Sequence, residues 1–190
     1  MKSLKFLLTL GCILIALQAR AAQSFNYIGA SYNYHTLVSN NEIWNKFSAS
    51  TPSFTLGRRF HPLYSAELSY SSYTYTEGAS DTVDDIVDSQ FDISQLRLGV
   101  RFFGKNISFS LGYSYVDVQR QLTLREGSNL NKDFYDYDRI LHGVYGTIGY
   151  QVFILGSIDL YTEIEASSNE QYHSIGASVG FRFYPGGLFK

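Results

Sequence analysis

The chain has 190 residues, a formal net charge of −2 and one cysteine, and its sixteen tyrosines, fourteen phenylalanines and sixteen glycines stand against three prolines. The slightly acidic balance argues against nucleic-acid binding, which needs a basic surface. The single cysteine excludes an intrachain disulfide framework. The composition is typical of an aromatic-rich β protein.

The N-terminal segment has the features of a Sec signal peptide. Lys2 and Lys5 precede an almost wholly apolar run over residues 6–17, and "ARA" at 19–21 places small residues where signal peptidase reads them. The alternative is a membrane helix, but the run is shorter than the roughly 20 residues that span a bilayer. We therefore expect a signal peptide over 1–21, a barrel over 22–184 and a short tail over 185–190. Cys12 leaves with the signal peptide, which rules out a thiolate metal site or a cysteine nucleophile.

Eight segments of the remaining chain alternate between apolar and polar residues, which predicts half-buried β-strands. They cover residues 28–34, 53–60, 64–75, 91–103, 107–119, 137–152, 157–167 and 174–184. The sixth segment can be phased in two ways, and the favoured phase places Ile140, Val144, Ile148 and Tyr150 on the apolar face. The eighth is expected to end near Tyr184, because Pro185 cannot donate a backbone hydrogen bond to a neighbouring strand.

The predicted connections alternate in length. Long polar stretches occupy 38–51, 76–90 and 120–136, whereas short ones occupy 61–63, 104–106 and 153–156. Residues 168–173 form a loop of moderate length at the long-loop end. Long loops at one end and tight turns at the other predict an antiparallel up-and-down meander.

The polar face of the strands decides between a soluble barrel, with its apolar residues inside, and a transmembrane barrel, with them outside. That face is rich in glycine and serine and poor in lysine, which suits the narrow interior of an eight-stranded barrel. It also carries four basic and four acidic residues: Arg59, Arg97, Arg101, Arg182, Glu67, Asp159, Glu163 and Glu165. An enclosed lumen needs such a balance, because an unpaired buried charge is costly. We expect pairs such as Glu67 with Arg101 and Asp159 with Arg182.

One basic residue does not fit this phasing. Arg58 is directed at lipid by the alternation of the second segment. It lies next to a turn, so a bulge or a snorkelling side chain would accommodate it.

The signal peptide, the eight alternating segments, the loop asymmetry and the terminal "VGFRF" together resemble the small eight-stranded outer-membrane barrels, typified by the OmpA transmembrane domain and the OmpX, Ail and opacity-type surface proteins. The resemblance covers nearly the whole exported chain. It implies an all-β, eight-stranded transmembrane barrel in the outer membrane of a Gram-negative cell. It also implies a strand-terminal aromatic residue that the barrel-assembly machinery recognises, and Phe183 matches that signal by pattern but not by position.

A barrel of this kind is compatible with three functions. The favoured one is a non-enzymatic, monomeric surface protein without a cofactor, whose loops contact a host ligand, another surface ligand or the envelope, including its lipid and lipopolysaccharide. A narrow solute or ion channel is the first alternative. A lipid-modifying enzyme is the second, because His35 and His173 end adjacent strands at the long-loop end, near Ser31, Ser174 and Glu170.

The second long loop is strongly acidic. Asp81, Asp84, Asp85 and Asp88 lie in a stretch that has no basic residue. Clustered carboxylates suit a hard cation such as Ca²⁺, but the spacing is not that of an EF-hand, and a solvated loop is the simpler interpretation. Whether this loop binds a metal is left open.

Overall fold

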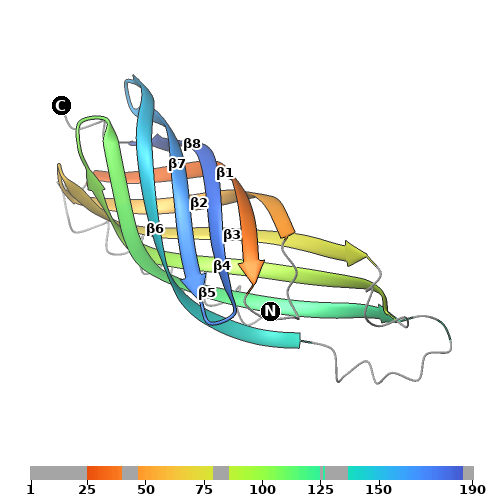
Figure 1. The fold of residues 1–190 in the computed structure, drawn as a ribbon. Coiled ribbons are helices and arrows are strands. Elements are labelled where there is room, and N and C mark those ends of the chain that lie inside the picture. The colour runs from red at the N-terminus through yellow and green to blue at the C-terminus, as the bar shows by residue number, and fades with distance from the viewer. Residues whose placement is uncertain (1–24, 40–46, 79–85, 125, 127–136, 186–190) are drawn as a thin grey trace.

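The computed structural model describes residues 25–39, 47–78, 86–124, 126 and 137–185, and these form a closed barrel of eight antiparallel strands (Figure 1). The strands are β1 Phe25–Ser39, β2 Phe47–His61, β3 Tyr64–Gly78, β4 Ile86–Phe103, β5 Ile107–Leu124, β6 Tyr137–Leu155, β7 Ile158–Asn169 and β8 Tyr172–Phe183. Each strand pairs with the next in sequence, and β8 pairs with β1. The predicted fold class is confirmed. The signal peptide over 1–21 and the tail beyond 185 lie outside the described residues.

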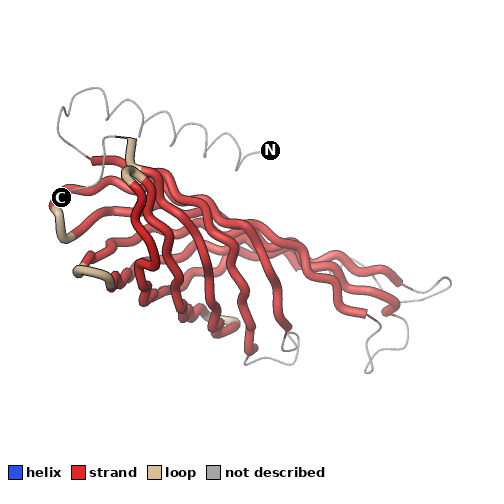
Figure 2. Tube along the Cα trace, turned by 90° about the horizontal axis from the view of Figure 1, so that it is seen from above, coloured by secondary structure: helices blue, strands red, loops and turns tan. Residues whose placement is uncertain are grey.

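The strands differ from the predicted segments chiefly by being longer. β4, β5 and β6 have 18, 18 and 19 residues, whereas β7 and β8 have 12 each. Neighbouring strands continue to pair well into the stretches that the sequence assigned to loops, for example between Gly78 and Asp88. As a result β3–β6 project beyond the ends of β1, β7 and β8 (Figure 1). The tube in Figure 2 shows the same one-sided extension from above.

The connection between β7 and β8 is a correction to the sequence analysis. A loop over 168–173 was expected, but both strands continue through most of it and only Glu170 and Gln171 connect them. The cause is Asn169, whose side-chain Oδ1 accepts hydrogen bonds from the backbone N–H groups of Gln171 and Tyr172, both at 2.9 Å. Asparagine commonly closes tight turns in this way.

The opposite end of the barrel, here called the turn end, has the short connections that the sequence predicts, at residues 62–63, 104–106 and 156–157. Gly156 occupies the left-handed region with φ of 57°, which a glycine adopts without strain. Arg58 stays on the outer face, because it pairs in regular register with Ala66 and the register shift between Arg59 and His61 comes only after it. Its guanidinium lies 5.5 Å from the centre of the Phe60 ring, on the outside of the barrel near the turn.

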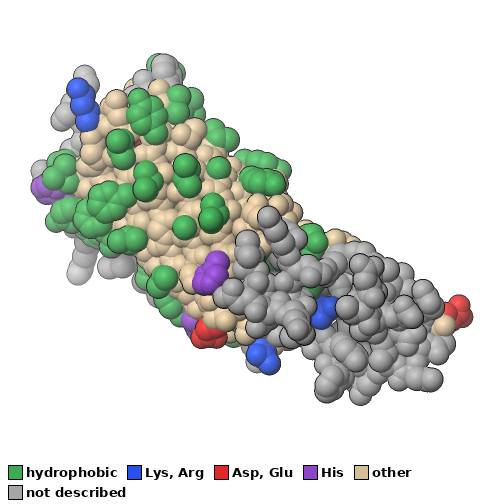
Figure 3. Space-filling view, viewed as in Figure 1, with side chains coloured by type: hydrophobic (Ala, Val, Ile, Leu, Met, Phe, Trp, Pro, Cys, Tyr) green, Lys and Arg blue, Asp and Glu red, His purple; other side chains and the backbone are tan. Residues whose placement is uncertain are grey.

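Apolar side chains cover the outside of the barrel wall. Ile148, Val144 and Ile175 are 68%, 63% and 67% exposed, and the sixth strand has the phase favoured from the sequence. Figure 3 shows apolar side chains spread over the face formed by β6, β7, β8 and β1. An apolar belt around a closed sheet is what a membrane-spanning barrel presents to lipid. Among the described residues, no helix is long and apolar enough to cross a membrane.

Candidate functional site

The barrel lumen contains the predicted charged residues, and at the turn end it is closed by aromatic side chains. The rings of Tyr27 and Tyr184 lie 5.1 Å apart between centres, and both residues are almost fully buried. The Tyr184 hydroxyl donates to Asp159 Oδ2 at 3.3 Å, and its backbone N–H donates to the Ser157 carbonyl at 2.8 Å. The Arg59 guanidinium lies 4.1 Å from the centre of the Phe103 ring. Tyr184 therefore continues beyond β8 as a plug of the lumen.

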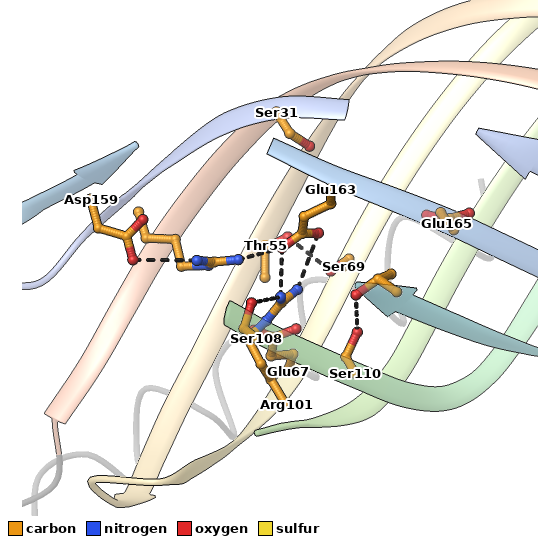
Figure 4. Close-up of polar contacts among 12 residues, drawn as sticks. Ser31, Thr55, Glu67, Ser69, Arg101, Ser108, Ser110, Asp159, Glu163 and Glu165 are labelled. Atoms are coloured by element: carbon orange, nitrogen blue, oxygen red, sulfur yellow. Dashed lines mark hydrogen bonds and ion pairs between the residues drawn. The ribbon is translucent and has the colours of Figure 1, made fainter. Parts of the chain in front are cut away.

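Arg101 and Arg182 organise the middle of the lumen, and Figure 4 shows Arg101 reaching toward Glu163. Arg101 lies between two carboxylates, with Nε 2.5 Å from Glu67 Oε1 and Nη1 2.5 Å from Glu163 Oε1. Arg182 Nη2 approaches the same Glu163 oxygen at 2.5 Å, and its Nη1 lies 3.3 Å from Asp159 Oδ2. Both expected pairs are thus present. Glu163 additionally bridges the two arginines, which strand-neighbour reasoning did not predict.

A second group lies farther from the turn end. Arg97 forms a bidentate pair with Glu165 and donates to Gln95 Oε1 at 2.9 Å. His35 Nδ1 lies 3.8 Å from Glu165 Oε1. Bidentate arginine–carboxylate pairs fix both geometry and charge. Seven of the eight predicted residues therefore divide into this group and the one around Arg101, while Arg59 lies among the aromatic rings of the turn end.

Several aromatic side chains pack against glycines of the inner wall, and the sequence did not predict these contacts. A Cβ on Gly112 would lie 2.6 Å from Tyr145 Cε1, and one on Gly176 would lie 2.5 Å from His35 Nδ1. The Tyr161 hydroxyl lies against Gly180, and the guanidinium carbon of Arg182 lies over the Tyr161 ring, 3.7 Å from its centre. The alternation of the strands does indicate these positions, because each of these rings is an even number of residues away from polar side chains of the inner face.

The projecting section, which here includes the loop-side ends of β1, β2 and β8 as well as the projecting parts of β3–β6, has the opposite polarity. Its inner face is a small apolar core, formed by Leu37, Ala49, Phe91, Ile93, Val116, Val118, Leu141 and Tyr172, with Tyr73 and Tyr75 packed against it. Its outer face is polar, as the alternation of Val116 and Val118 with Asp117 and Gln119 illustrates. Such a polarity is that of a soluble protein, so this section stands outside the apolar belt.

The outer wall of this section is acidic. The register places Asp92 opposite Gln119, and Gln119 opposite Asp138, with Asp117 in the adjacent row. Thr74 Oγ1 donates to Asp92 Oδ1 at 2.7 Å. Partial burial, together with the charge of Asp138, raises the pKa of the Asp117 carboxyl. The wall thus presents carboxylates that already repel one another.

The candidate residues for catalysis and metal binding are not brought together. His35 is buried inside the lumen, whereas His173 lies on the outer face and contacts Ser168 Oγ at 2.9 Å, so the rim constellation is wrong. The two side chains point to opposite faces of the barrel wall, and the wall therefore separates them. Asp88 lies in β4, while Asp81, Asp84 and Asp85 lie outside the described residues. Within the described ranges no three His, Cys, Asp or Glu side chains gather in a possible metal site.

The fold is similar to solved structures of small outer-membrane barrels. Ail of Yersinia pestis, in complex with the heparin analogue sucrose octasulfate, aligns with a TM-score of 0.58 and 12% identity over 85% of this chain and 99% of that one. OprG of Pseudomonas aeruginosa aligns with a TM-score of 0.57 and 9% identity, over 84% of this chain and 95% of OprG. Neisserial surface protein A aligns with a TM-score of 0.53 and 16% identity, over 83% of this chain and 96% of that protein. No protein-family model matches the sequence, and no curated protein does.

The chain therefore has the fold of the small eight-stranded outer-membrane barrels. The resemblance inferred from the sequence is confirmed at this level. At these identities the likeness concerns the fold.

Proposed function

We propose that the protein is a monomeric, non-enzymatic barrel of the Gram-negative outer membrane that acts through the section projecting at its loop end. The signal peptide would deliver it to the periplasm, and the barrel-assembly machinery would insert it with the turn end facing the periplasm. The projecting section then lies outside the cell. There it contacts a host ligand, another surface ligand, or the lipopolysaccharide of the envelope.

The observation that carries this proposal is the filling of the lumen at successive levels. Aromatic rings around Tyr184 fill the turn end, the Arg101 network fills the middle, and the apolar core around Val116 fills the projecting section. A barrel of eight strands has room for side chains and little else. The protein therefore acts from its outside, where the projecting strands offer an extended surface.

The charge of that surface favours a basic partner. The stretch over 72–95 contains six acidic residues and no basic one, and the outer wall adds Asp117 and Asp138. Ail is described with a sulfated heparin analogue, but a polyanion would be repelled by this wall. We therefore expect the partner to be cationic.

Binding by intact cells tests the proposal. Cells expressing the full chain are compared on polylysine and heparin surfaces with cells whose residues 79–85 are replaced by seven Gly and Ser residues. Retention on polylysine should depend on ionic strength. It should fall in the replacement strain, because the Gly and Ser linker lacks the three carboxylates of residues 79–85. A replacement of residues 40–46 by the same kind of linker is the matched control. Equal retention of all three strains, or preference for heparin, would count against the proposal.

A further inference from the structure

Two adjoining grooves indent the lipid-facing side of the barrel over β6, β7, β8 and β1. The first, of about 610 Å³, is lined by residues including Tyr32, Tyr34, Tyr150, Ala177 and Val179. The second, of about 560 Å³, includes Gly146, Ala166, Ile175, Ser168 and His173. They adjoin because Ile175 and Ala177 are successive outward-facing residues of β8.

Small residues create the depression. The strand register places Gly146 beside Ala166 and Ala166 beside Ile175 in one row, and Ile164 beside Ala177 and Ala177 beside Tyr34 in the next. Where Gly, Ala or Thr faces outward, the wall lacks the Leu and Phe side chains that fill the belt elsewhere. Figure 3 shows backbone and small groups between separated apolar side chains on this face.

The length of the depression matches one leaflet of a bilayer. From His173 to Val179 it follows β8 for six residue steps, which is about 20 Å at roughly 3.3 Å per residue. With a strand tilt of about 40° this becomes about 15 Å along the membrane normal. The hydrocarbon core is about 30 Å thick. The depression therefore runs from the outer boundary of the hydrocarbon core to about its middle.

The chemistry of the lining changes in the same direction. At the outer end His173 and Ser168 contact one another on the outward face and make that end polar. Below them the outward-facing residues are apolar or small, with tyrosines along the β1 side. A lipid has the same order, with its polar headgroup above its acyl chain.

We propose that this depression binds one acyl chain of a lipid in the leaflet at the loop end of the barrel. The inference rests on the membrane insertion in the proposed function, and adds a binding site on its wall. A second copy of the chain suits the site less well, because a two-fold dimer would place one concave surface against another. A flexible chain follows a narrow concave surface and contacts its small residues closely.

Photo-crosslinking tests the site. The full chain is reconstituted in phosphatidylethanolamine–phosphatidylglycerol vesicles containing a phosphatidylcholine with a diazirine on one acyl chain, and labelled residues are located by mass spectrometry. Labelling of β7 and β8 around Ala166 and Ala177 should exceed that of β3 around Ala66 several-fold. The double variant Ala166→Phe with Ala177→Phe should lose this excess, whereas Ala66→Phe, on the opposite lipid-facing wall, should retain it.

The possible failures are distinct. Even labelling around the belt, or an excess that survives the filling variant, would overturn the proposed site while leaving membrane insertion intact. A second sample carries the diazirine on an amino-acid side chain at position 177 instead of on the lipid, and crosslinks from that position to another protein chain would assign the depression to a second copy. A wild-type chain that does not insert would instead contradict the proposed function, and heat-dependent gel mobility of each sample detects that case.

Discussion

The ring of Tyr27 lies directly over Gly57 on the inner wall of the barrel. A Cβ placed on Gly57 would be 2.0 Å from Tyr27 Cζ, well inside any contact that real Cβ atoms make. The Tyr27 hydroxyl at the same time reaches Glu67 and, at 3.0 Å, Ser65. The glycine therefore makes room for a ring that links the aromatic plug to the charge network.

Gly57→Ala should destabilise the barrel by about 1–3 kcal/mol, because the added methyl must displace a ring held on several sides. Urea unfolding in detergent micelles measures the loss. The double variant Tyr27→Ala with Gly57→Ala should lose less than the sum of the two single variants, since the clash is absent. Additive losses would show that the ring and the glycine are independent.

Arg101→Ala should cost about 3–5 kcal/mol, because Glu67 and Glu163 would remain buried without that partner. The shift of the unfolding midpoint in urea measures it. Adding Glu67→Gln to Arg101→Ala should recover part of the loss by removing one uncompensated charge. A double variant less stable than Arg101→Ala itself would contradict this account of the network.

Leu141→Ala should loosen the projecting section and leave the membrane-spanning part folded. Leu141 is 1% exposed in the apolar core, and such truncations cost about 2–5 kcal/mol. Hydrogen exchange of the Val116–Val118 backbone should accelerate, while exchange near Arg101 stays unchanged. Ile140→Ala, its outward-facing neighbour, is the control. Uniform acceleration of hydrogen exchange along β5 would mean that the projecting section has no separate core.

Asp117→Asn should slightly stabilise the projecting section at neutral pH. Burial and Asp138 raise the pKa of Asp117, so the folded chain binds this proton more tightly than the unfolded chain, and stability from this group increases as the pH falls. The gain should stay below about 1 kcal/mol because the carboxyl is only partly buried and solvent screens its charge, and it should vanish in acid. Thermal unfolding at several pH values tests this, with Asp92→Asn as the control.

Phe183→Ala should reduce the folded fraction in the outer membrane, if the strand-terminal aromatic is the assembly signal. Phe183 faces outward, 41% exposed, at the end of β8. Deletion of residues 186–190 should leave assembly intact. Heat-dependent gel mobility of membrane fractions measures the folded fraction of both variants. Loss of assembly on deletion but not with Phe183→Ala would move the signal into the tail.

The alternation of residues predicted the strand number, the closed antiparallel order and the outward phase, because a barrel wall separates lipid from a polar lumen at every second residue. It did not predict Glu163 bridging Arg101 and Arg182, since that contact depends on side-chain reach across the lumen. The projecting core was missed for another reason. At Val116 the inner face turns apolar, so a rule that reads apolar as outward loses the phase there; the predicted segment ended at residue 119, whereas β5 continues to Leu124 with an apolar interior.

Ion conductance of the purified, reconstituted protein in a planar bilayer shows whether side chains close the lumen, as they must if the protein acts from its outer surface. We expect no discrete current steps above noise for the wild type, and none for Gly57→Ala at temperatures where it stays folded. Steady current steps in the wild type, altered by Arg101→Ala, would contradict this expectation and assign the charge network to a conducting pathway.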